Sequence, residues 1–357
     1  MRTLPATQRL LPAGIAALAA ACGEAPPTID AEIVISSVDT LVPAEAELFE
    51  RPSEATLGRD GLLFITDAGA SRIFVFDTTG QMVREIGRAG AGPEEFQGPR
   101  SLTPIGDTLL IVDGFNARLQ RVTSAGVFLG TSLLPHVALG GAVSLASGPT
   151  GGAHMLVSTR GRDNSLAMLL DEAGAEVRRL GLPPAALPEM IDFVEVKREI
   201  GEGRVPAMFR ALAVPVLAPD LSAWLVLVAE GEVWRYSATG DLLWTARFEG
   251  PEFERIKARF FELNRADPNP SRFFPLNYVA AARQQDQNLW LLLRMPEDEG
   301  AHLVILSPDG SILARIQVPA ATGVRAFDVD AESRTLYLMA YYDGALLRAR
   351  LPGDLEY

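Results

Sequence analysis

The chain has 357 residues, of which 48% are hydrophobic, and its formal net charge at pH 7 is −13. A chain this acidic lacks the basic face that phosphate binding needs, so we expect no nucleic-acid partner. The 32 glycines and 25 prolines favour a fold with many turns over one with long helices.

The first 21 residues predict a signal peptide. Arg2 and Arg9 give a basic start, the apolar run Leu10–Ala21 is too short to span a bilayer, and small residues lead to Cys22, the only cysteine. This segment resembles a bacterial lipoprotein leader, in which the new N-terminal cysteine is acylated. In those leaders a leucine usually stands three places before the cysteine, and here that place is taken by Ala19. Plain secretion after Ala21 is the alternative.

We therefore expect a signal peptide over residues 1–21, a lipidated Cys22 and a tether over residues 22–31. The lipid would hold the protein to a membrane of the bacterial cell envelope. A lone cysteine at this point cannot form an internal disulfide.

A short polar turn that ends in glycine recurs along the chain, each time after an apolar run rich in β-branched and aromatic residues. The turns are Asp77–Gly80, Thr123–Gly126, Asp171–Gly174, Ser237–Gly240, Ser307–Gly310 and, in degenerate form, Leu351–Gly353. At most steps they recur every roughly 45 residues, which is typical of four-stranded blades around an axis. The sequence therefore predicts an all-β fold, a monomeric six-bladed β-propeller over residues 32–357.

The remaining steps are roughly 20 residues longer than the others, which predicts insertions at about 183–209 and 250–276. The stretch Pro251–Leu263 has apolar residues at helical spacing and acidic residues in its first turn, so we expect a helix there. Glu189–Ile200 is a weaker helix candidate. Both insertions connect one blade to the next on the same face, so we expect them side by side as a partial lid over the channel mouth.

The last predicted blade lacks an outer strand, because only residues 354–357 follow Gly353. Near the N-terminus, Glu32–Ser37 has alternating character and belongs to no blade. We therefore expect Glu32–Ser37 to pair as the outermost strand of the blade that contains Leu336–Arg350. Such a strand would close the ring and remove an exposed sheet edge.

Polar residues follow the second strand of the first two blades in a shared pattern. They are Asp67, Ser71 and Arg72 in the first blade and Asp113, Asn116 and Arg118 in the second. Over about residues 50–130 this pattern resembles the NHL repeat, which implies a six-bladed propeller. Because that family contains both binding modules and enzymes, the resemblance implies no single activity. We expect these side chains to cap turns and link blades rather than to face a ligand.

No catalytic motif stands out in the sequence. His136, His154 and His302 occupy non-equivalent places and would not converge on the axis, so we expect no histidine metal site. Asp286, Asp328 and Asp330 lie on or near inner strands. Carboxylates there leave open an enzyme of the lactonase or lyase type, with an axial divalent metal held by carboxylates.

The predicted starts of the inner strands carry an unusual number of arginines. Aligning the blades places Glu54, Arg100, Val143, Arg210, Asn277 and Arg325 at roughly corresponding positions. Forked guanidinium donors suit carboxylate, sulfate or phosphate groups. We therefore expect Arg100, Arg210, Arg325 and Asn277 to bind an anionic small molecule or a protein partner at the channel mouth, without a cofactor. The alternative is that each arginine pairs with a neighbouring carboxylate.

Overall fold

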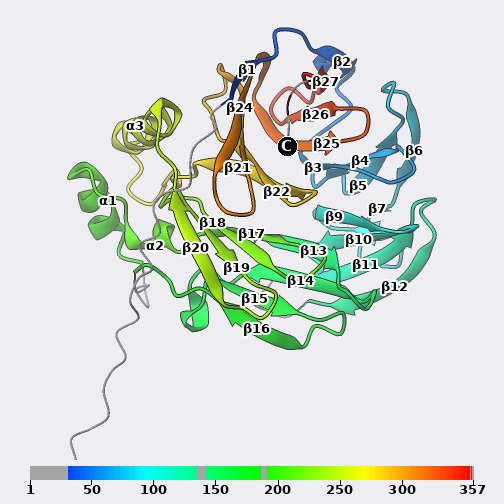
Figure 1. Cartoon of the computed structure of the whole chain (residues 1–357), viewed down its shortest axis with the longest axis horizontal. Helices are drawn as coiled ribbons and strands as arrows, with labels where there is room; N and C mark the ends of the chain where they lie inside the picture. Colours follow the sequence, from blue (N-terminus) through cyan, green and yellow to red (C-terminus); the bar gives the residue numbers. More distant parts are fainter. Residues whose placement is uncertain (1–30, 135–141, 186–190, 354, 356–357) are drawn as a thin grey trace, which may run out of the picture.

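Six antiparallel sheets stand in a ring around one axis in the computed structural model, which describes residues 31–134, 142–185, 191–353 and 355 (Figure 1). In the first three blades the strands run outward from the axis in chain order. Blade 1 comprises β3 (Pro52–Leu57), β4 (Leu63–Asp67), β5 (Arg72–Phe76) and β6 (Met82–Ile86); blade 2 comprises β9 (Pro99–Ile105), β10 (Thr108–Asp113), β11 (Arg118–Thr123) and β12 (Phe128–Leu133); blade 3 comprises β13 (Val143–Ser147), β14 (Ala153–Ser158), β15 (Ala167–Leu170) and β16 (Glu176–Leu180).

The last three blades follow the same meander, and the predicted six-bladed propeller is confirmed. Blade 4 comprises β17 (Ala213–Leu217), β18 (Ala223–Leu227), β19 (Glu232–Tyr236) and β20 (Leu242–Arg247); blade 5 comprises β21 (Val279–Gln285), β22 (Asn288–Leu293), β23 (Gly300–Leu306) and β24 (Ile312–Thr322); blade 6 comprises β25 (Val324–Asp330), β26 (Thr335–Ala340) and β27 (Leu346–Arg350). Short elements complete the list: β7 (Arg88–Ala89) paired with β8 (Glu95–Phe96), and single 3-10 turns at Ala44–Ala46 and Arg162–Asn164.

The glycine-ended turns lie between the third and fourth strands of blades 1 to 5. Their glycines share a left-handed backbone, with φ between 82° at Gly174 and 94° at Gly126. A side chain would strain this conformation, which explains why glycine recurs at this place. In blade 1 the Asp77 carboxylate accepts hydrogen bonds from the Thr79 hydroxyl and backbone nitrogens, and these bonds lower the pKa of Asp77.

The N-terminal segment closes the ring, but not in the way the sequence predicts. The outer strand of blade 6 is β2 (Asp39–Val42), which pairs antiparallel with β27. The segment that was expected there begins with β1 (Ala31–Val34), which instead pairs parallel with β24 as a fifth strand of blade 5. The prediction for Glu32–Ser37 is therefore wrong in its partner, while closure by an N-terminal strand is confirmed. Both pairings cover a sheet edge that would otherwise be open.

The core lies between the blades, where apolar side chains of one sheet pack against the next. The inner strand of every blade contacts the inner strands of its neighbours, and β25 contacts β3 at the point where the ring closes. Cross-blade hydrogen bonds reinforce these contacts, as from the Ser53 hydroxyl to the Pro99 carbonyl (3.0 Å). The axis is therefore lined by six inner strands that pack side by side.

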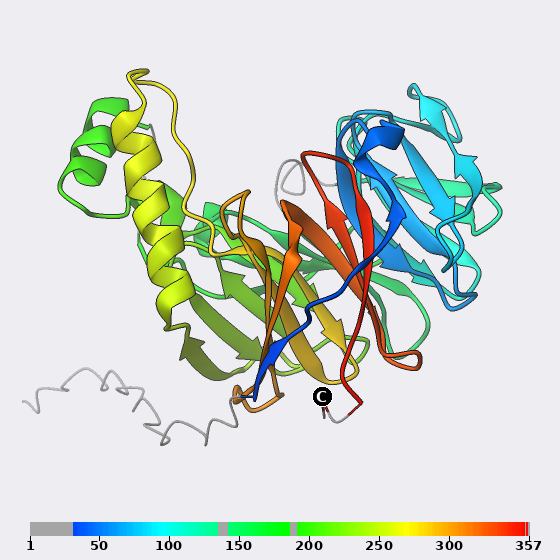
Figure 2. The ribbon, with the colours of Figure 1, turned by 90° about the horizontal axis from the view of Figure 1, so that it is seen from above.

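The two insertions form neighbouring helices, as predicted. α1 (Phe193–Gly201) begins at Asp192, whose carboxylate accepts from the backbone nitrogens of Val194 and Glu195. α2 (Ala207–Arg210) follows, and α3 is Pro251–Ala266. Lys197 of α1 donates to the Asn264 carbonyl of α3 (3.1 Å), and Figure 2 shows both helices rising beside each other at one side of the ring. Among the described residues, none of the helices is long and apolar enough to span a bilayer.

The ring has two distinct faces. We call the face that carries the turns after the first and third strands of each blade the turn face. The opposite face carries the loops after the second strands and the blade-to-blade connections, including the insertions, and we call it the connection face (Figure 2).

The pairing of β2 with blade 6 can be tested by mutation. Val42 is buried (5% exposed) against blades 6 and 1, whereas Val34 at the end of β1 is 60% exposed. We expect Val42→Asp to lower the free energy of unfolding by about 3 kcal/mol, because it buries an unpaired carboxylate in the closing strand. Val34→Asp is the matched control and should change it by less than about 0.5 kcal/mol. Equal thermal melting curves for the two variants would contradict closure through β2.

Candidate functional site

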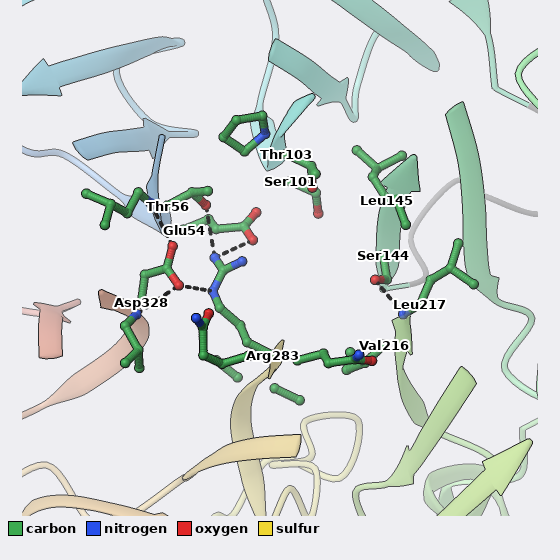
Figure 3. Close-up of a pocket in the computed structure, with 18 of the residues that line it drawn as sticks. Glu54, Thr56, Ser101, Thr103, Ser144, Leu145, Val216, Leu217, Arg283 and Asp328 are labelled. Atoms are coloured by element: carbon green, nitrogen blue, oxygen red, sulfur yellow. Dashed lines mark hydrogen bonds and ion pairs between the residues drawn. The ribbon is translucent and has the colours of Figure 1, made fainter. Parts of the chain in front are cut away.

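A cavity of about 1180 Å³ runs along the axis and is lined by the inner strands of all six blades (Figure 3). Its wall is uneven. Blades 3 and 4 contribute small or apolar side chains, among them Ser144, Leu145 and Val216. Most of the charged side chains come from blades 5, 6 and 1 on the other side, and Arg100 of blade 2 adds one more among the described lining residues.

Arg283 of β21 is the centre of this charged half. Its Nη2 donates to Glu54 Oε1 (2.7 Å), to the Ala55 carbonyl (2.7 Å) and to Thr56 Oγ1 (3.0 Å), all on β3. Its Nε donates to the Phe327 carbonyl on β25 (2.8 Å) and lies 3.9 Å from Asp328 Oδ1. One guanidinium therefore joins three blades.

The two carboxylates also hold backbone groups of neighbouring blades. Glu54 Oε2 accepts from the Leu102 nitrogen of blade 2 (2.9 Å), and Asp328 Oδ2 accepts from the Leu57 nitrogen of blade 1 (2.6 Å). Across the cavity, Ser144 Oγ accepts from the Leu217 nitrogen in the same manner (2.9 Å). Side-chain acceptors on the inner strands thus satisfy amides that face the channel, where a buried unpaired amide would be costly.

Burial dominates the electrostatics of the Arg283 cluster. It raises the pKa of Glu54 and of Asp328 above their usual values, against the lowering effect of the Arg283 charge. Burial acts to lower the pKa of Arg283, but the charges of the two carboxylates outweigh burial, so the pKa of Arg283 is raised. The side chains are only partly exposed, at 20% for Arg283, 21% for Glu54 and 15% for Asp328.

The two ends of the cavity carry opposite charges. Arg100 and Arg325 line it near the connection face, where the inner strands begin. Asp286, Asp330 and Glu332 line it near the turn face, where those strands end, beside a single cation, Arg59. An anion entering from the connection face would meet arginine first and carboxylate last.

Two of the predicted ligand-binding arginines share a local geometry. Arg100 lies in β9 at a break in the pairing between Pro99 and Ser101, and Arg325 lies in β25 at a break between Val324 and Ala326. A bulge of this kind aims a side chain away from the regular alternation of a strand. Both arginines line the axial cavity, as the sequence alignment suggested.

Each of these arginines has a second arginine beside it. Burial and the nearby charge of Arg160 lower the pKa of Arg100. Arg294, at the end of β22, has its pKa lowered by burial and by the charge of Arg325. Two like-charged pairs therefore lie on the connection face around the cavity entrance, an arrangement that a bound anion would relieve.

The other two predicted residues lie elsewhere. Arg210 is in α2, before β17 begins at Ala213, and forms a short ion pair with Glu230 rather than lining the axial cavity. Asn277 precedes β21 and lines a second cavity beside α3, which Arg325 also reaches. Cys22 lies outside the described residues.

No residue of α1, α2 or α3 is among those that line the axial cavity in the described part of the chain. The expectation of a partial lid over this mouth is therefore wrong. α3 instead forms one wall of the second cavity. Its apolar face packs on blades 4 and 5, since Phe253, Ile256 and Phe260 belong to the same buried cluster as Trp224 and Leu291.

The polar residues that resemble the NHL pattern have structural roles, as expected. Asp67 is fully buried and accepts from the backbone nitrogens of Glu50 (2.8 Å) and Arg51 (2.9 Å). Asp113, also fully buried, accepts from Asn116 (2.8 Å) and Arg118 (3.0 Å). These carboxylates hold the loops of the connection face in place.

The carboxylates at the axis do not fit a resident divalent metal. Among the described residues no group of three or more histidine, cysteine, aspartate or glutamate side chains is placed to hold an ion. Glu54 and Asp328 converge instead on Arg283, whose guanidinium already supplies the positive charge between them. We therefore derive no chemical step through an axial metal.

Comparisons with known proteins agree with this architecture. A family model described as a 6-bladed beta-propeller matches residues 46–120. A search of curated proteins found no match. Among solved structures, similar folds include a virginiamycin B lyase from Staphylococcus aureus (14% identity, TM-score 0.52, covering 90% of this chain and 86% of that one) and a gluconolactonase from Xanthomonas campestris (12%, 0.51, 88% and 89%). The calcium-binding protein regucalcin from Agrobacterium tumefaciens is similar as well (11%, 0.52, 90% and 95%). At these identities the likeness shows the fold alone.

Sequence reasoning missed Arg283 and the role of Glu54. The alignment of the blades places Glu54 with the arginines but predicts no partner for it, and the sequence suggests a role for Asp328 only as a metal ligand. A signal was present, because Arg283 is a lone charged residue after three alanines on a predicted inner strand. Its partners lie on other blades, so the signal pointed to no particular contact.

The Arg283 cluster predicts a pH-dependent loss of stability. Arg283→Met leaves two partly buried carboxylates without their cation, so we expect the free energy of unfolding to fall by about 3 kcal/mol at pH 8. The pKa of each carboxyl in the folded chain would then rise further above its unfolded value. Between those two values the folded chain binds more protons, so its stability falls as pH rises.

In thermal melts, the loss of stability caused by Arg283→Met should therefore be smaller at pH 5 than at pH 8. Adding Asp328→Asn should restore part of the stability that the variant has lost. Arg210→Gln removes a surface ion pair and is the control, with an expected change of less than about 1 kcal/mol at either pH. An Arg283→Met protein as stable as the parent at both pH values would rule out this role.

Proposed function

We propose that this propeller is a binding protein of the bacterial cell envelope that takes up an anionic small molecule at the connection-face entrance of its axial cavity. The observation that supports the proposal is the placement of Arg100 and Arg325 in bulges at that entrance, each beside a second arginine. Like charges held together in a partly buried mouth create a local field that favours an anion in spite of the net charge of −13.

A ligand that binds both arginines would be larger than a simple ion. Arg100 belongs to blade 2 and Arg325 to blade 6, with blade 1 between them. A ligand that engages both would span the inner strand of that blade. The uncharged wall from blades 3 and 4 would face its neutral part, and the acidic far end of the cavity would stop a polyanion from passing through.

This proposal can be tested by melting the protein with a panel of sugar acids, dicarboxylates and organic phosphates. We expect at least one of these anions to raise the melting temperature of the parent protein, and the Arg100→Gln/Arg325→Gln double variant to lose that shift. Losing two charge-assisted hydrogen bonds should weaken binding by roughly a hundredfold, measured by calorimetry. Arg210→Gln is the control, because Arg210 is paired with Glu230. The same affinity in the double variant would refute the site.

The proposed location rests on the leader-like N-terminal sequence and the lone cysteine. We expect the protein to fractionate with membranes when expressed in a bacterium that processes lipoproteins. Cys22→Ser should move it to the soluble fraction, because a single lost attachment point removes all acyl chains at once. Gly23→Ala, which leaves the cysteine intact, is the control. A Cys22→Ser protein that stays with membranes would show that the anchor is not at Cys22.

A further inference from the structure

A second cavity, of about 820 Å³, lies between α3 and the connection-face loops of blades 5 and 6. One wall is apolar and consists of side chains from α3 and from the segment that follows it. They are Ile256, Phe260, Leu263, Phe274, Pro275 and Leu276. Cavities of this size with a mostly apolar wall are typical of small-molecule sites.

The opposite wall holds two guanidinium groups, those of Arg294 and Arg325. Within the described residues the Arg294 side chain forms no hydrogen bond or ion pair, and it lines this cavity. Among the described residues, Arg325 donates to the backbone carbonyls of Val324 (2.9 Å) and Met295 (3.4 Å), and its guanidinium lies 5.4 Å from the ring centre of Tyr342. Its Nε is buried, with no hydrogen-bond partner in the part of the chain that the structure describes.

Asn277 adds an acceptor to this wall. Its Oδ1 is buried and has no hydrogen-bond partner within the described chain. An unpaired buried amide oxygen costs free energy that a donor on a ligand would recover. The polar wall thus offers two positive donors and one neutral acceptor.

The rim of the cavity disfavours highly charged ligands. Glu297, Asp298 and Glu299 lie there, and of these Glu299 pairs with Arg255 (3.2 Å). A doubly charged phosphate would be repelled by these carboxylates more strongly than a singly charged carboxylate. Arg259 also lines the cavity, but its charge is engaged by Glu262 (2.9 Å).

We propose that this second cavity binds an amphipathic organic carboxylate whose apolar body lies against α3 and whose head carries an N–H or O–H beside the carboxylate. The carboxylate accepts from Arg294 and Arg325, and the adjacent donor reaches Asn277 Oδ1. N-acyl amino acids have this chemistry. This site is separate from the proposed axial site: the two cavities share Arg325, but Arg294 lines only the second one.

The test is calorimetric titration of the full-length protein with N-octanoylglycine. We expect saturable binding, and binding weaker by roughly tenfold to a hundredfold in Arg294→Gln, because a charge-assisted hydrogen bond is lost. The neutral analogue N-octanoylglycinamide should be weakened to a similar degree. Octanoate, which lacks the N–H, should bind the parent less tightly than N-octanoylglycine, and Asn277→Ala should abolish that difference.

Two controls separate this site from its surroundings. Arg210→Gln alters a residue that lines neither cavity and is paired with Glu230, so it should leave the affinity unchanged. Arg100→Gln alters the axial site and should also leave it unchanged, so failure of one site does not imply failure of the other. The proposal is overturned if N-octanoylglycine shows no saturable binding, if Arg294→Gln binds it as tightly as the parent, or if the neutral amide binds as well as the acid.

Discussion

The guanidinium of Arg283 contacts blades 5, 6 and 1 at once, and these are the blades on either side of the point where the ring closes. A propeller has no continuous sheet around its axis, so its blades are held by packing and by scattered polar contacts. Here Arg283 and Asp328 add polar contacts at the seam between the last and first inner strands, β25 and β3, which also pack against each other. At the outer edge of the same seam, β2 from the chain start completes blade 6. The geometry of the axial cavity depends on both.

The position of Arg283 also determines which side chains along the axis are engaged by the protein itself. Glu54 and Asp328 are engaged by Arg283 and by backbone amides, so they serve the protein itself before any ligand. The arginines that line the cavity nearer the connection face, Arg100 and Arg325, lie further out, in the bulges of β9 and β25. The fold therefore places its structural charges in the middle of the channel and its candidate binding charges at one end.

Local chemistry explains which features the sequence predicted. The glycines of the turns in blades 1 to 5 have a left-handed backbone, so their spacing reports the blade repeat directly. The helix at Pro251–Ala266 follows from periodic apolar residues that its own blades bury. Features that depend on distant partners were not predictable. Arg283 and Glu54 are 229 residues apart, and Glu32–Val34 and Asp39–Val42 are both short strand-like segments, so the pattern alone did not say which one completes blade 6. Arg210 follows no strand period, and α2 separates it from β17.

The parallel pairing of β1 with β24 fixes the face from which the N-terminal segment departs. β24 begins just after the turn at Ser307–Gly310, and Ala31 is aligned with Ala314 near that start, so the chain reaches β1 from the turn face. Eight residues separate Cys22 from Ala31, a reach of at most about 30 Å. If Cys22 is lipidated, as proposed above, a segment this short would keep the turn face nearer the membrane than the connection face. The carboxylate-rich end of the axial cavity would then lie toward the anionic head groups, and its arginine-lined end toward the surrounding fluid.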